Sequence, residues 1–176
     1  ILQNIEINHN AIEYLETGYD EQLFSKIEKT NIYNDNSKNA IKFIYGGSLN
    51  IQGSEKGIKN LIKCFHQVCI ENSIDNIYFD IYCSNNEEEL DLAIYLDVNN
   101  FSNHIRVHKR ISNEKFIQEL LQSNIGFIPL PNTDHVNNFS SSMKFFEFVR
   151  ANLFILASDV EANKRFHYKK LKLYKH

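Results

Sequence analysis

The sequence predicts an α/β fold in which helices cover both faces of a parallel β-sheet. Short apolar segments rich in Ile, Phe and Tyr alternate along the chain with segments whose apolar residues recur at helical spacing. This alternation is typical of β-α-β units, whose strands run parallel and are buried on both faces. Right-handed crossovers between such units give a Rossmann-like sandwich, in which ligands bind beyond the carboxyl ends of the strands.

The elements follow in order from these patterns. The first strand is expected at 41–45 and ends at Gly46 and Gly47, and a helix is expected from about Ser54. Its apolar residues form one helical stripe: Ile58, Leu61, Ile62, Phe65, Val68 and Cys69. Further strands are expected at 77–82, 105–107, 125–128 and 153–157. Helices are expected at 87–97, with Leu90, Ile94 and Tyr95 facing inward, and after the capping residue Ser112.

The polarity of the chain suggests three parts. Residues 1–40 are rich in Asn and Glu and are interpreted as a linker or the remnant of an interdomain region, with a short helix at 19–29 and a polar linker at 31–39. Residues 41–163 form the expected Rossmann-like domain. Residues 164–176 contain Lys and Arg but no acidic residue, and form a basic tail.

Bulk properties exclude several classes. A net charge of −3 and an apolar content of 43% are ordinary for a globular protein. The sequence has no long apolar run and no secretory signal at its start, so a cytoplasmic protein is expected. Cys64, Cys69 and Cys83 lack Cys-x-x-Cys spacing and are expected to be buried, reduced thiols. The histidines are scattered without the spacing of metal ligands, so no metal is expected.

The segment 140–159 is the most informative part of the chain. It combines a serine-rich loop, a short helix that ends abruptly, and a buried strand. Ser141 and Ser142 precede the helix, where hydroxyl groups cap backbone N–H groups and where the helix dipole favours an anion. Lys144 lies in the first turn, and Glu147 follows one turn later on the same face. The helix start thus offers hydrogen-bond donors for phosphate groups, followed along the helix by a lysine and a carboxylate. This order suits a nucleotide diphosphate with its ribose.

Simpler interpretations of the same residues stay open. Lys144 and Glu147 also fit an i,i+3 salt bridge on the surface, worth about 0.2–0.5 kcal/mol. The phenylalanines at 145, 146 and 148 are expected to pack in the core rather than stack on a ligand. The polar loop at 130–139 either contacts sugar hydroxyls or is disordered without a ligand. His108 is either a pocket residue or a surface histidine, and the surface position is favoured.

The segment resembles the donor-binding motif of GT-B glycosyltransferases, in particular the group 1 (family 4) class. The residues that match are Ser142, Lys144, Glu147, Phe148, Ala151, Ile155, Leu156, Ala157, Ser158 and Asp159. Phe139 and Phe154 stand where many members of this class have Glu and Pro. Asn152 stands where they have Gly, and Asn is the next-best residue for a left-handed helix C-cap.

A second segment is similar to the Gly-Arg and Lys-Gly segment of the same class, in which the Arg and Lys reach the leaving diphosphate. Gly47 and Lys56 match, whereas Ser48 stands where the Arg would be. This departure removes a bidentate phosphate ligand that a lysine cannot replace geometrically. Without the resemblance, the glycine pair would indicate only a turn.

The resemblance covers residues 41–160 and implies the donor-binding, C-terminal half of a glycosyltransferase. Such an enzyme moves a sugar from a nucleotide sugar to a glycan or lipid-linked acceptor, as in polysaccharide biosynthesis, without a bound metal or other cofactor. The implied donor site consists of Gly47, Ser48, Lys56, Ser141, Ser142, Lys144 and Glu147. The class carries an N-terminal acceptor domain as well, so this chain alone is expected not to turn over.

Other functions stay open. The replacements at positions 48, 139 and 154 also favour a non-catalytic glycosyltransferase-like module that binds a nucleotide or a partner. The basic tail either contacts anionic lipid at the inner face of a membrane or is a solvated end. No nucleic-acid partner is expected, because the rest of the chain is acidic and carries no nucleic-acid motif. An unrelated epimerase or response-regulator-like fold would need a Gly-x-Gly-x-x-Gly motif or an acidic pocket, and neither is present.

Overall fold

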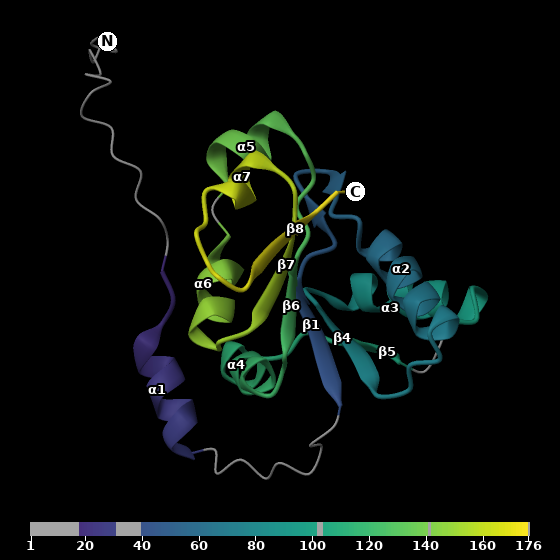
Figure 1. Cartoon of the computed structure of the whole chain (residues 1–176), viewed down its shortest axis with the longest axis horizontal. Coiled ribbons are helices and arrows are strands. Elements are labelled where there is room, and N and C mark those ends of the chain that lie inside the picture. Colours follow the sequence, from purple (N-terminus) through teal and green to yellow (C-terminus); the bar gives the residue numbers. More distant parts are fainter. Residues whose placement is uncertain (1–17, 31–39, 102–103, 141, 176) are drawn as a thin grey trace.

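The computed structural model describes residues 18–30, 40–101, 104–140 and 142–175, and it confirms the predicted fold class. Six parallel strands form one sheet in the order β5-β4-β1-β6-β7-β8, with helices on both faces (Figure 1). The strands of this sheet are β1 (Ile41–Gly47), β4 (Ile77–Cys83), β5 (Ile105–His108), β6 (Ile125–Ile128), β7 (Phe154–Ser158) and β8 (Leu171–Tyr174). The helices are α1 (Glu21–Thr30), α2 (Ile58–Glu71), α3 (Asn86–Val98), α4 (Asn113–Leu121), α5 (Asp134–Phe139), α6 (Met143–Arg150) and α7 (Glu161–Lys164).

The strand order creates a switch point in the middle of the sheet. From β1 the chain moves outward through β4 to β5, and it then crosses back to β6, on the other side of β1, and continues through β7 to β8. The strands β1 and β6 are therefore neighbours whose following connections diverge. In sheets of this kind, ligands bind where the connections diverge, beyond the carboxyl ends of the strands.

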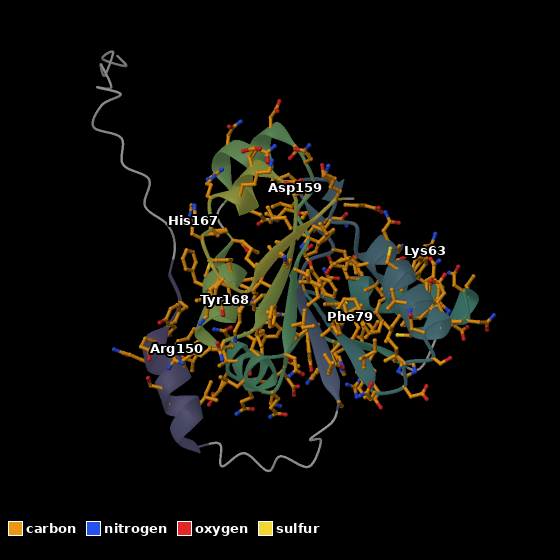
Figure 2. The ribbon with its side chains drawn as sticks, in the orientation of Figure 1. Lys63, Phe79, Arg150, Asp159, His167 and Tyr168 are labelled. Carbon is orange, nitrogen blue, oxygen red and sulfur yellow. The ribbon has the colours of Figure 1, made fainter. Side chains whose placement is uncertain are left out.

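Two apolar cores hold the layers together. On one face, α2 and α3 cover a cluster centred on Ile62 and Phe79, and Figure 2 shows Phe79 on this side of the sheet. On the other face, α1, α4 and α6 cover a cluster that includes Ile44, Ile117 and Phe148. All five of these side chains are at most 1% exposed, so both faces of the central strands are fully covered.

Two glycines let aromatic rings lie directly on the sheet. A Cβ atom on Gly46 would come within 2.3 Å of the Phe116 ring, and one on Gly126 within 2.4 Å of the Phe148 ring. Gly46 lies near the carboxyl end of β1, and Phe116 belongs to α4. Gly126 lies in β6, and Phe148 belongs to α6. These two contacts set how closely α4 and α6 approach the strands.

The helix α6 ends as the sequence predicts. Asn152 adopts a left-handed conformation with a φ of 60°. Its N–H donates to the carbonyl of Val149 at 2.9 Å, and the N–H of Leu153 donates to the carbonyl of Phe148 at 3.0 Å. These two bonds form a Schellman motif, which closes the helix and turns the chain into β7. The side chain of Asn152 also accepts a hydrogen bond of 2.7 Å from Lys170.

The start of α2 differs from the expectation. The helix begins at Ile58 rather than near Ser54, because β2 (Asn50–Ile51) and β3 (Ser54–Glu55) form a small antiparallel hairpin before it. Gln52 and Gly53 both have positive φ, which is the backbone of a tight two-residue hairpin turn. One residue that was expected in the apolar stripe of α2, Val68, is 47% exposed and does not face the core.

Three further expectations are corrected. Leu90 and Ile94 of α3 face solvent, with exposed fractions of 61% and 54%, and Leu92 is the residue of this helix that is fully buried. Cys64 is exposed, whereas Cys69 and Cys83 are buried as predicted. The polar loop expected at 130–139 contains the helix α5, whose N-terminus is capped by Thr133.

Both ends of the described chain are part of the folded domain, although their sequences are polar or basic. The helix α1, close to the predicted helix at 19–29, buries Phe24 and Ile27 in the core, while the predicted linker at 31–39 lies outside the described residues. Arg150 of α6 pairs with Glu21 of α1 at 2.8 Å, and Figure 2 shows Arg150 beside α1. The strand β8 lies within the basic segment 164–176 and pairs with β7, so the sheet extends past the expected boundary at 163. Within the described residues, no helix has the length and apolar composition that crossing a membrane requires.

The left-handed conformation at position 152 can be tested by substitution. Asn152→Ala should lower the free energy of unfolding by about 1–2 kcal/mol, the cost of placing a residue with an ordinary Cβ in this region. Asn152→Gly should stay within about 1 kcal/mol of the parent, because glycine adopts positive φ without strain. Asn138→Ala, at an exposed position of α5, is the control. Urea unfolding measures all three, and an equal effect of Ala and Gly at 152 would contradict the cap.

Candidate functional site

A cavity of about 500 Å³ lies at the carboxyl ends of β1 and β4, next to the switch point of the sheet. Its walls come from β1, β4, the connection that leads from β5 into α4, and the first turn of α6. The lining residues are Gly46, Gly47, Tyr82, Cys83, Ser84, Arg110, Ile111, Asn113, Phe116 and Lys144. Two of these carry a positive charge, and none of the residues named carries a carboxylate. The electrostatic character of the cavity therefore favours an anion.

The glycine pair at the end of β1 lines this cavity without side chains that would fill it. Gly47 has a φ of 140°, a conformation that side chains rarely adopt. Gly46 leaves room for the ring of Phe116. The resemblance assigned Gly47 to the donor site, whereas Gly46 was expected only to end the strand, and the structure places both residues in the lining together with Lys144, almost a hundred positions later.

Lys144 connects the cavity to the buried side of α6. Its Nζ donates to Oε2 of Glu147 at 2.7 Å and lies 4.2 Å from the centre of the Phe116 ring. The i,i+3 pair is therefore formed, but Glu147 is only 7% exposed, so it is not an ordinary surface pair. Glu147 is held behind the lysine and is not part of the lining.

The N-cap residue of α6 does not cap the helix through its side chain. Ser142 occupies the N-cap position in an extended conformation, and its hydroxyl makes no capping hydrogen bond. The predicted hydroxyl cap is thus not formed. Ser141, the other serine assigned to the site, lies outside the described residues.

Neither Ser48 nor Lys56 lines the cavity. Ser48 instead binds Glu88 of α3, and the charge of Glu88 acts on Lys56. The Ser48 hydroxyl and the N–H of Leu49 donate to Oε1 of Glu88 at 2.6 and 2.9 Å. Ser84 donates to its Oε2 through the hydroxyl at 2.6 Å and the N–H at 3.2 Å. Burial opposes the charge of Glu88, but these hydrogen bonds outweigh it and hold its pKa below the usual value. Burial lowers the pKa of Lys56, and the charge of Glu88 opposes this shift.

A second carboxylate, Asp80 of β4, supports the wall that carries Tyr82. Asp80 is 2% exposed and accepts from Arg106 at 2.8 Å and from Nε2 of His108 at 2.7 Å. Lys42 lies 3.5 Å from the same carboxylate. Burial opposes ionisation, yet the His108 bond and the two cations hold the pKa of Asp80 below its usual value.

The side chain of His108 is 36% exposed and is held at the surface by contacts with Asp80 and Tyr82. Its ring stacks on Tyr82 at 4.5 Å between centroids, with 13° between the planes. The pair fixes the tyrosine that lines the cavity and also fixes the exit of β5. His108 does not line the cavity itself.

The thiol in the cavity is not a nucleophile at neutral pH. Burial, together with the charges of Glu88 and Glu89, raises the pKa of Cys83 to about 12. A thiol with this pKa stays protonated, and the thiolate is the reactive form.

Sequence reasoning missed several lining residues, above all Tyr82, Arg110 and Asn113. The signal for Arg110 was available: it follows a predicted strand, and the carboxyl ends of parallel strands share one edge of a sheet. Glu88 also carried a local signal, because Asn85 and Glu88 have the spacing of a helix cap, and the side chain of Asn85 accepts from the N–H of Glu88 at 2.9 Å. Its contacts with Ser48 depend on tertiary structure and have no local signal.

Comparisons with solved structures show the same fold in larger enzymes. The chain is similar to α,α-trehalose 6-phosphate synthase from Burkholderia multivorans, with a TM-score of 0.64 and 12% identity over 90% of this chain and 39% of that one. The UDP-forming α,α-trehalose-phosphate synthase from Burkholderia xenovorans, in complex with glucose-6-phosphate, gives a TM-score of 0.65 and 11% identity over 91% and 39% of the two chains. A Listeria monocytogenes protein assigned as a UDP-N-acetylglucosamine 2-epimerase gives 0.51 and 10% identity over 89% and 35%.

These similarities show the fold alone, that of one Rossmann-like half of a GT-B-type enzyme. The chain spans less than half the length of each of these proteins. No protein-family model and no curated protein matches the sequence.

Removing the charge of Asp80 should have a pH-dependent cost. Asp80→Asn should lower the free energy of unfolding at pH 7 by about 1–3 kcal/mol, because Arg106 and His108 lose their charged acceptor, a carboxylate that is only 2% exposed. Since the folded pKa of Asp80 is depressed, its contribution is present above the unfolded pKa of about 3.9 and is lost as pH falls through the folded value. The difference between parent and variant should therefore shrink below pH 4 in urea unfolding.

Asp91→Asn is the matched control for this measurement. Asp91 pairs with Lys59 at 2.8 Å, but its side chain is 55% exposed, so its loss should cost less than about 1 kcal/mol. Equal costs for the two variants at pH 7, or a difference that grows on acidification, would contradict the role given to Asp80.

Proposed function

We propose that this domain binds the diphosphate end of a nucleotide sugar in the cavity at the carboxyl ends of β1 and β4, as the donor-binding half of a glycosyltransferase. The observation that carries the proposal is that Gly47 and Lys144, from the two separate motifs, line one cationic cavity beside the switch point. The resemblance of both motifs to group 1 (family 4) enzymes, and the GT-B-type fold, support the same function.

The chemistry of the cavity suits a diphosphate. Positive side chains and the exposed backbone of the glycine pair stabilise the negative charge that develops on a departing nucleotide diphosphate. The first turn of α6, which Ser142 does not cap through its side chain, brings backbone N–H groups near Lys144. The ionic bond from Lys144 to Glu147 holds the ammonium group in place before a ligand arrives. The ribose-binding role that the resemblance implies for Glu147 stays a prediction, because this carboxylate lies behind Lys144 and outside the cavity lining.

Transfer of the sugar requires more than donor binding. The acceptor must be held beside the donor, and such positioning can supply about 7–11 kcal/mol of the barrier. In the proposed enzyme that task belongs to a second, acceptor-binding domain. The acceptor is proposed to be a glycan or lipid-linked sugar, as in polysaccharide biosynthesis.

A second candidate function is a non-catalytic module that binds the nucleotide without transfer. The specific observation in its favour is that Ser48, at the position of a phosphate-binding arginine, is bound to Glu88 and lies outside the cavity lining.

Contact of the basic segment 164–176 with a membrane also stays a prediction. Within that segment, Lys164 already pairs with Glu161 at 2.7 Å and Lys170 with Asn152.

The charge of Lys144 provides the direct test of the proposed site. UDP, GDP or ADP should raise the melting temperature of the parent by mass action. Lys144→Gln should remove most of this rise, because about 1.5–3 kcal/mol is typical of a hydrogen bond to a charged group. Glutamine is preferred to alanine here because its amide can still donate to the buried Glu147.

The control is Lys115→Gln, which removes a charge from an exposed position of α4 outside the cavity lining. Each variant is compared with its own unliganded melting temperature, so that any change in intrinsic stability is separated from binding. If the Lys144 variant and the parent respond alike to all three nucleotides, the phosphate site has been misplaced.

A further inference from the structure

We infer that Arg110 is the second cation of the diphosphate site and takes the role of the arginine that the motif lacks at position 48. The inference rests on the proposed function and identifies a binding residue for it. The observation behind it is that Arg110 and Lys144, from different elements, line the same cavity.

The backbone on both sides of Arg110 is fixed. Two residues before it, His108 is bound to Asp80 at 2.7 Å and stacked on Tyr82. Two residues after it, Ser112 caps α4 by accepting from the N–H of Lys115 at 3.3 Å. The connection from β5 to α4 is therefore tethered at each end, which places Arg110 at the cavity rim.

The guanidinium group is available to a ligand. Within the described part of the chain, Arg110 makes no hydrogen bond or ion pair, whereas Arg106 is committed to Asp80 and Lys144 to Glu147. The other positive group assigned to the site, Lys56, lies outside the lining and near Glu88. Arg110 is thus the uncommitted cation among the residues that line the cavity.

The side-chain type fits the role. A guanidinium group binds phosphate oxygens through two parallel N–H bonds, which a lysine cannot reproduce. Gly47 in the lining lets phosphate groups approach the backbone closely, and Lys144 lines the same cavity from α6. A diphosphate bound by both Arg110 and Lys144 would have its charge balanced by cations from two separate elements.

The test compares binding of UDP and of inorganic pyrophosphate by calorimetry to the parent, Arg110→Gln, Arg110→Lys and Lys109→Gln. Lys109 is the matched control, because it is an exposed neighbouring cation outside the cavity lining. Arg110→Gln should weaken both ligands about tenfold or more, as expected for the loss of a charge-assisted contact. Arg110→Lys should fall between the parent and Arg110→Gln, and Lys109→Gln should stay within about twofold of the parent.

Melting temperatures without ligand should be equal for all four proteins, since neither side chain has a partner among the described residues. Equal losses for Arg110→Gln and Lys109→Gln would show a general charge effect and overturn the inference. Unchanged binding to Arg110→Gln, with loss in Lys144→Gln, would overturn it while leaving the proposed function standing. Absence of UDP and pyrophosphate binding by the parent would overturn the proposed function and this inference together.

Discussion

The candidate site depends on two contacts between a glycine and an aromatic ring. Phe116 of α4 lies on Gly46 of β1, and Phe148 of α6 lies on Gly126 of β6, each where a Cβ atom would collide with the ring. Since β1 and β6 are neighbours, both helices settle side by side on one face of the sheet at its switch point. Lys144 then lies across the ring of Phe116, so the packing of apolar groups positions a charged one.

Two carboxylates, Glu88 and Asp80, hold the strand ends around the cavity but do not line it. Glu88 ties the exit of β1 to the exit of β4 through Ser48 and Ser84, and Asp80 ties down the exit of β5 through His108. Each of these carboxylates is committed to protein donors, and the cavity lining itself carries only cationic and neutral side chains. The arrangement explains how a chain of net charge −3 can present a cationic cavity at one edge of its sheet.

The sequence was sufficient for the features that have local causes. Alternating patterns predicted the parallel sheet, and the tolerance of Asn for positive φ predicted the end of α6 at Asn152. Features that depend on distant partners were not predictable: His108 is bound to Asp80 of another strand, and Ser48 is bound to Glu88 of α3 and lies outside the cavity lining. Leu90 and Ile94 were misplaced because α3 is apolar on both sides, so its pattern does not indicate which side faces the sheet.

The central claim is that an anionic nucleotide binds at the carboxyl ends of β1 and β4, and a titration of the isotopically labelled protein with UDP tests it most directly. The backbone amide resonances of Gly47, Ser84, Asn113 and Lys144 should shift together with one dissociation constant, because these residues surround one cavity. Resonances of the exposed side of α3 should not move. Shifts confined to α3 or to the β7–β8 edge, or no shifts at millimolar UDP, would contradict the account.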